Sequence, residues 1–308
     1  MTNRGEPDAP EATTTRLAWH HLPDAVRAAV IDACGPVRHA KPHPNGSLIF
    51  LRTEAEQRVC LKAARVGTAA GLAVRREQRT RALRDDLPAP GLVLADTIDD
   101  WYVTLLRHVS GSNARLHPDS AHLEPVLAAL AGLAPRLTAG SVPDDAVLAE
   151  ADLSRVVDDA WTILDSHTPH LAREERGLLE RALHGFEMDA AAGTTLLNGN
   201  LDPRNILLTP GGVHLLDWGR AAYGAAWLDA VPFGLHLIHD GHAPGQAETL
   251  LADSFGSWRA APHKAVTGLI AAWTADHIFR AVRHPQQQGA AVLVPAGLLW
   301  LRHRTRPD

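Results

Sequence analysis

Cysteine is scarce in this 308-residue chain, and long apolar runs are missing. Cys34 and Cys60 stand alone, with no CxxC pair and no histidine at zinc spacing, which argues against a disulfide framework and against a zinc site. No apolar stretch reaches the length of a membrane span, and residues 1–15 are polar where a signal peptide needs apolar residues. We therefore expect a cytoplasmic protein without membrane association, beginning with a disordered tail at residues 1–15.

A strongly basic segment is also missing. The chain has 30 basic and 35 acidic residues, a net charge of −5, and its arginines are scattered rather than clustered. This balance argues against a nucleic-acid partner and against an anionic membrane surface. The length suits two lobes that each bury a core, and the 45% hydrophobic content is that of an ordinary globular protein.

The first third of the chain alternates polar turns with short runs of apolar and β-branched residues, which favours a small antiparallel sheet. Residues 69–84 lack proline and are rich in Ala, Arg, Leu and Glu, which predicts one helix within this region. The predicted strands cover residues 36–41, 46–52, 58–63, 92–96 and 101–106.

Helical patterns dominate the rest of the chain. Helices are predicted at 120–138, 146–166 and 170–190, with four more between 224 and 305. Three short strand-like runs, 194–197, 206–209 and 213–216, interrupt them, and the last two are separated by a Pro-Gly-Gly turn. The sequence thus predicts an α+β protein with an N-terminal lobe at 16–108 and a helical lobe at 109–308.

The loops beside these short strands carry the chemistry. Residues 197–205 read Leu-Asn-Gly-Asn-Leu-Asp-Pro-Arg-Asn, and residues 216–219 read Leu-Asp-Trp-Gly. They resemble the catalytic and metal loops of aminoglycoside phosphotransferases and related small-molecule kinases, whose first loop reads H-G-D-x-x-x-x-N. Asn205 and Asp217 match the metal-binding positions of that family. Taken singly they are a turn residue and a strand-end cap, but together they favour a Mg²⁺ site.

The resemblance implies a two-lobed protein-kinase-like fold with a small antiparallel β-sheet N-lobe carrying one helix, and a larger, mainly helical C-lobe. It also implies that ATP and Mg²⁺ bind between the lobes. Asp229, in Gly-Ala-Ala-Trp-Leu-Asp at 224–229, matches the residue that supports the catalytic loop through backbone hydrogen bonds.

Lysine is rare enough here to be informative, because only Lys41, Lys62 and Lys264 occur. Lys62 lies in a predicted strand, where a kinase places the lysine that contacts the α and β phosphates, and Glu77 on the following helix matches its partner. Taken singly, they would be a surface lysine and a solvated glutamate. The downstream loops favour the nucleotide-binding interpretation.

Two further segments resemble parts of the family's nucleotide-binding site. Residues 43–47, His-Pro-Asn-Gly-Ser, fall between the first two predicted strands, where the family has a loop that covers the phosphates. Residues 105–109 match the hinge whose backbone meets the adenine ring. The first segment contains a single glycine, Gly46.

The sequence departs from the family where catalysis is concentrated. Asn198 replaces the motif's histidine and Asn200 replaces its catalytic aspartate. An amide cannot take the proton of the acceptor hydroxyl as a carboxylate does, and such a base is worth about 10²–10⁴-fold in rate. Asp202 is an alternative base two positions away.

Three hypotheses remain open from the sequence. The first is an ATP-dependent phosphotransferase that acts on a hydroxyl of a small molecule or a modified peptide. The second is a nucleotide-binding pseudokinase with a regulatory role and a protein partner. The third is a kinase fold used for another nucleotidyl chemistry. Restoring the acid with Asn200→Asp is expected to leave folding almost unchanged and to separate the first two hypotheses.

Overall fold

Two separate clusters of secondary structure make up this computed structural model, which describes residues 17–44, 46, 48–166, 171–285, 289 and 291–306. The first unit runs to Asp85 and takes in Pro90–Val109, and the second holds Asp86–Ala89 and resumes at Ser110. The expected N-terminal tail at 1–15 lies outside the described residues.

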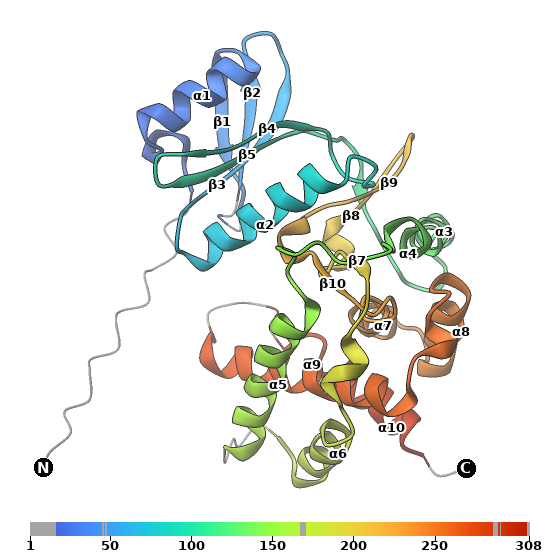
Figure 1. Cartoon of the computed structure of the whole chain (residues 1–308). Helices are drawn as coiled ribbons and strands as arrows, with labels where there is room; N and C mark the ends of the chain where they lie inside the picture. The colour runs from blue at the N-terminus through green and yellow to red at the C-terminus, as the bar shows by residue number, and fades with distance from the viewer. Residues whose placement is uncertain are drawn as a thin grey trace, which may run out of the picture. The chain divides into compact units, whose positions relative to one another are not determined.

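The first unit is built on a five-stranded antiparallel sheet with strand order β1-β2-β3-β5-β4 (Figure 1). Each strand overlaps the run of apolar and β-branched residues that predicts it. The strands are β1 Val37–Pro42, β2 Ile49–Thr53, β3 Arg58–Arg65, β4 Leu92–Ile98 and β5 Trp101–Arg107.

A helix covers each face of this sheet. The predicted helix is α2, Ala69–Leu83, and its Val74 packs with Ala64 of β3. The other face buries Leu61 of β3 against α1, Asp24–Cys34, a helix ahead of the sheet that the sequence analysis does not predict. Because side chains alternate along a strand, Lys62 faces α2 while Leu61 faces α1.

The second unit is mainly helical and contains one large hydrophobic core. The predicted helix at 120–138 is divided in two near Gly132, and the four helices expected between 224 and 305 are all present among the described residues. None of the described helices combines the length and apolar character that crossing a membrane requires. The helices are α3 Leu123–Ala131, α4 Leu133–Leu137, α5 Ala149–Asp165, α6 Arg173–Leu183, α7 Ala230–His239, α8 Pro244–Ser254, α9 His263–Arg283 and α10 Val294–Arg304.

Short strands in the second unit place its loops (Figure 1). β7, Thr195–Leu197, pairs with β10, Ala222–Gly224. β8, Ile206–Thr209, forms a hairpin with β9, Gly212–Leu215, and also pairs with β6, Ser112–Asn113. The loop after β7 and the loop after β9 therefore begin at defined strand ends, as the sequence predicts.

Candidate functional site

The first unit brings one lysine and one glutamate together. Lys62 lies in the middle of β3, opposite Thr104 of β5, on the face that packs against α2. Its Nζ donates to Oε2 of Glu77 over 2.7 Å. The Glu77 side chain is 3% exposed and that of Lys62 is 12% exposed, so the pair is largely removed from water. A buried carboxylate of this kind depends on its cation for stability.

The two other segments expected to contact the nucleotide lie at strand ends. Gly46, with φ of 73°, donates its N–H to the carbonyl of His43 over 2.9 Å in the turn from β1 to β2. Asn45 and Ser47 of this expected phosphate-covering loop lie outside the described residues. The expected hinge, 105–109, continues from β5, and the N–H of His108 donates to the carbonyl of Arg58 over 3.0 Å.

One buried carboxylate holds the loop that follows β7. Asp229 is 5% exposed and accepts the N–H of Asn198 at 2.8 Å and the N–H of Gly199 at 2.9 Å. Burial raises the pKa of Asp229 to about 6, although both hydrogen bonds lower it. Asp229 is therefore ionised at neutral pH and fixes the backbone just before Asn200, as the resemblance implies.

Gly199 lets this loop pack closely against the segment after β9. Its φ of 71° lies in the left-handed region, and a Cβ built on it would lie 2.5 Å from the carbonyl oxygen of Arg220. A side chain at this position would collide with that backbone. The glycine therefore sets the distance between the loop and Arg220.

Asn198 is a fully buried amide in the loop after β7. Its Oδ1 accepts the N–H of Asn200 at 3.1 Å, and its Nδ2 donates to the carbonyl of Leu216 at 3.4 Å. Both ends of the amide thus have partners, as a buried polar group requires. This amide connects the loop to the segment that carries Asp217.

Asn200 stands between the two residues expected to bind metal. Its Nδ2 donates to Oδ2 of Asp217 over 2.8 Å, and its carbonyl accepts Nδ2 of Asn205 at 3.3 Å. Asp217 has φ of 54° and ψ of 64°, a left-handed conformation that is uncommon for a residue with a side chain. The structure thus gathers Asn200, Asn205 and Asp217 into one hydrogen-bonded group.

The donor atoms of Asn205 and Asp217 fit Mg²⁺. A carboxylate and an amide oxygen are hard ligands, and Mg²⁺ in kinase sites takes few protein ligands, with phosphate and water completing its shell. Among the described residues, no group of three or more His, Cys, Asp or Glu side chains is placed to hold a metal. A cation at this position would therefore depend on phosphate and water ligands.

Asp202 is turned toward Arg204. Its Oδ1 accepts the backbone N–H of Arg204 at 2.8 Å and Nε at 2.9 Å, while Nε2 of His236 lies 4.0 Å from Oδ2. Burial raises the pKa of Asp202, but the Arg204 hydrogen bonds and nearby positive charge outweigh it, so the pKa lies below its usual value. This environment makes Asp202 a weak base and supports its role as the cap of the short helix Pro203–Asn205.

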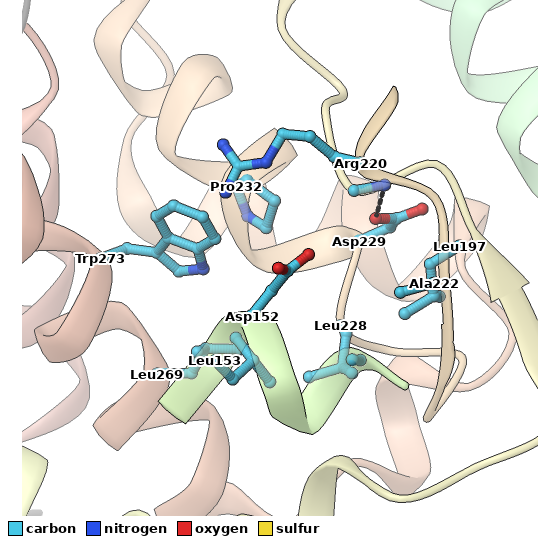
Figure 2. Close-up of a pocket in the computed structure, with 12 residues that line it drawn as sticks. Asp152, Leu153, Leu197, Arg220, Ala222, Leu228, Asp229, Pro232, Leu269 and Trp273 are labelled. Atoms are coloured by element: carbon cyan, nitrogen blue, oxygen red, sulfur yellow. Dashed lines mark hydrogen bonds between the residues drawn. The ribbon is translucent and has the colours of Figure 1, made fainter. Parts of the chain in front are cut away.

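The second unit also contains a pocket that the sequence analysis does not single out. Gly199 and Asp229 border it, and Figure 2 shows the Asp152 carboxylate and the Arg220 guanidinium pointing into the same space, beside the ring of Trp273. About 460 Å³ of this space holds no protein atoms, part of it open to solvent. The only signal in the sequence is that Arg220 directly follows Asp217-Trp218-Gly219.

Comparison with known proteins gives structural matches and no sequence match. No family model and no curated protein matches this chain. An aminoglycoside phosphotransferase from Alicyclobacillus acidocaldarius is 16% identical, with a TM-score of 0.58 over 92% of this chain and 95% of its own. The choline kinase LicA from Streptococcus pneumoniae is 14% identical, with a TM-score of 0.58 over 89% and 97%. The aminoglycoside phosphotransferase APH(4)-Ia is 12% identical, with a TM-score of 0.62 over 92% and 99%.

These similarities define the class of fold. The chain has the two-lobed protein-kinase-like fold, with a small antiparallel sheet in the first lobe and mostly helices in the second, as the sequence predicts. Within that class, the solved structures that it resembles are small-molecule phosphotransferases. At 12–16% identity, the likeness establishes the fold alone.

Proposed function

We propose that this chain is an ATP- and Mg²⁺-dependent phosphotransferase that acts on a hydroxyl group of a small molecule or a modified peptide. The observation that carries the proposal is the buried ion pair of Lys62 and Glu77, 2.7 Å apart, in a chain with three lysines. A structure of LicA holds AMP, and a mutant of APH(4)-Ia was crystallised with AMP-PNP and hygromycin B, which supports a nucleotide and a small acceptor here too.

Each residue has a defined task in this proposal. Glu77 holds the Lys62 ammonium, which would contact the α and β phosphates, while Asn205 and Asp217 would hold Mg²⁺. When bound, the ion would supply positive charge that neutralises the phosphate oxygens. The acceptor oxygen forms a bond to the γ-phosphorus, the bond from that phosphorus to the departing ADP oxygen breaks, and the hydroxyl proton is released. Most of the rate in such a reaction comes from positioning and charge neutralisation.

Asn200 acts in this proposal by orientation and not as a base. Its Nδ2 is engaged with Asp217, so its Oδ1 is the atom that can accept a hydrogen bond from the acceptor hydroxyl. The proton then leaves to solvent or to the transferred phosphoryl group. Without a carboxylate base the reaction is expected to be about 10²–10⁴-fold slower than one that has it.

Transfer of label from ATP tests this function directly. ATP labelled at the γ-phosphate is incubated with the full chain, Mg²⁺ and a panel of hydroxyl compounds and peptides, and labelled products are separated. Wild type should label at least one acceptor, and Asp217→Ala should reduce the rate by about 100-fold or more, since charge stabilisation is lost. Equal labelling by the two proteins would contradict the proposal.

A nucleotide-binding pseudokinase is the second candidate, and one observation favours it. The Asn200 amide is bonded to Oδ2 of Asp217, so a neutral group stands where the family has its base. Under the first function Asn200→Asp should raise the transfer rate. If the chain is a pseudokinase, Asn200→Asp should bind Mg·ATP and still label no acceptor.

A further inference from the structure

The pocket beside the catalytic loop is lined by the cationic side chain of Arg220, which stacks on the ring of Trp273. The guanidinium carbon of Arg220 lies 5.5 Å from the centre of the Trp273 ring, and Figure 2 shows the two side chains together at one side of the pocket. Arginine stacked on an indole is favourable and keeps its N–H groups at the edge of the stack. That face of Trp273 is therefore occupied by the protein's own cation and cannot receive a ligand ammonium.

Two other arginines near Arg220 each form an ion pair with a carboxylate. Arg280 lies 2.6 Å from fully buried Asp276, and Arg155 lies 3.7 Å from Asp159. Within the described part of the chain, the Arg220 guanidinium makes no hydrogen bond or close ion pair with a carboxylate, and Figure 2 marks none to Asp152. Two of the three arginines thus have an acidic partner, and the third faces the pocket.

The surroundings of Arg220 disfavour its positive charge. Burial lowers the pKa of its guanidinium, Arg280 and Arg155 lower it further, and Asp152 and Asp276 oppose them. An arginine remains charged even so. The positive charge of this half-buried guanidinium is only partly neutralised by nearby carboxylates. Binding of an anion to it is therefore more favourable than binding to an exposed guanidinium, because water competes less for its N–H donors.

Apart from Arg220, Asp152 and Asp229, the residues that line the pocket are mostly apolar, and the pocket adjoins the loop that carries Asn200. Leu153, Leu228 and Leu269 are buried residues of its wall. Gly199, the residue before Asn200, borders the pocket and packs on the Arg220 backbone. A ligand in the pocket would therefore place its body against leucine side chains, close to the catalytic loop.

We propose that this pocket binds the carboxylate end of the acceptor, with the guanidinium of Arg220 as its specificity-determining partner and the leucine wall receiving an apolar body. The word acceptor rests on the proposed phosphotransferase function, but binding itself does not. The planar fork of the guanidinium matches a carboxylate with two parallel hydrogen bonds. The expected ligand class is a small hydroxy acid with an apolar skeleton.

A charge series of one molecular shape tests this assignment. The probes are para-(hydroxymethyl)benzoate, its neutral alcohol analogue and its benzylammonium analogue, which share a ring and a hydroxyl and differ in charge. Their dissociation constants for the full chain are measured by ligand-observed NMR titration, without ATP. The benzoate should bind about 10-fold or more tightly than the neutral probe, which is the effect of one charge-assisted hydrogen bond.

Variants identify the residue responsible. Arg220→Gln should remove the preference for the benzoate, while Arg259→Gln, which changes an exposed arginine paired with Asp253, should keep it. Equal or tighter binding of the neutral or ammonium probe to wild type overturns the proposal, as does a folded Arg220→Gln variant that keeps the preference. If that variant does not fold, the wild-type series alone decides.

The test also separates this proposal from the proposed function. Selective binding of the benzoate without any phosphoryl transfer would leave the pocket assignment standing and count against the kinase activity. Transfer to neutral or cationic acceptors, together with no benzoate binding, would support the activity and overturn the carboxylate assignment.

Discussion

Two hydrogen-bonded pairs of almost equal length, one in each unit, differ in charge. Lys62 and Glu77 are 2.7 Å apart and carry two opposite full charges, whereas Asn200 and Asp217 are 2.8 Å apart and carry one. Burying two charges costs desolvation that a well-packed apolar pair would avoid. The first pair therefore has the form expected of a functional contact, whereas the second pairs one charge with a neutral amide.

The same contrast exists within the second unit, between Asp229, which holds the loop after β7, and Asn200 in that loop. Asp229 keeps its carboxylate and accepts two backbone N–H groups, while Asn200, two positions after the first of these donors, is an amide. A carboxylate at position 200 would face Asp217 directly, and two such groups need a cation or a shared proton. One buried carboxylate thus holds the loop, while position 200 is neutral.

The largest effect is expected when the charged pair is broken from one side. Lys62→Met leaves the Glu77 carboxylate buried without its cation and should lower the free energy of unfolding by about 3–5 kcal/mol. Urea denaturation measures this change. Combining Lys62→Met with Glu77→Leu should recover much of the loss, and Lys264→Met, at an exposed lysine, should change stability by less than about 0.5 kcal/mol. A single Lys62→Met variant as stable as wild type would contradict the account of this pair.

Asp229→Asn should cause the next largest loss in the free energy of unfolding. An asparagine turns an amide N–H₂ toward one of the two N–H donors, so one buried hydrogen bond is lost at a cost of about 1–3 kcal/mol. Asp119→Asn, at an exposed aspartate, is the matched control. Equal losses in both variants would show that the buried contacts of Asp229 contribute nothing.

The pH dependence of that loss has a definite sign. The pKa of Asp229 rises from 3.8 to about 6 on folding, because burial favours the protonated form. A raised pKa means that this group's contribution to stability is fully present below 3.8 and is lost as the pH rises through 6. The deficit of Asp229→Asn relative to wild type should therefore shrink between these two values, and a deficit that grows with pH would contradict the assignment.

A smaller effect is expected at the amide pair. Asn200→Asp replaces the hydrogen bond to Asp217 with two facing carboxylates, which should cost about 1–2 kcal/mol without a divalent cation. This revises the expectation from sequence that folding stays almost unchanged. Added Mg²⁺ should restore the melting temperature of Asn200→Asp more than that of wild type, since the cation neutralises both groups. Identical Mg²⁺ responses of Asn200→Asp and Asn200→Ala would argue against this arrangement.

Arg204→Ala should have the smallest effect. The Arg204 side chain is 81% exposed, so its ion pair with Asp202 is worth about 0–1 kcal/mol. The backbone N–H of residue 204 still donates to the capping carboxylate of Asp202 in this variant. Chemical denaturation should place the variant within that range, and a loss above about 2 kcal/mol would show that this pair holds the loop.

The sequence predicts the charged pair better than the neutral one. Strand alternation and the helix after β3 place Lys62 and Glu77 on elements that must pack together once the sheet forms, so their contact follows from local pattern. The bond from Asn200 to Asp217 depends on how two loops approach each other. Local periodicity carries no information about that distance.

The pocket arginine illustrates the same limit. Arg220 and Trp273 are far apart in the chain and meet because the loop after β9 and helix α9 pack in the same core. Helix α1 does not follow from the sequence for a related reason, since its stability comes from Val26 and Val30 packing on the sheet. Both the Arg220–Trp273 contact and helix α1 therefore depend on tertiary packing.

Magnesium-dependent binding of ATP tests the proposed function most directly, because that proposal requires both Lys62 and Asp217. Calorimetric titration of the full chain with ATP, with Mg²⁺ and with a chelator, measures it alongside the melting temperature. The account predicts binding in the micromolar to millimolar range with Mg²⁺, a raised melting temperature by mass action, and loss of that shift in Asp217→Ala. A wild-type chain whose stability at millimolar ATP is unaffected by Mg²⁺ would contradict both the phosphotransferase and the pseudokinase hypotheses.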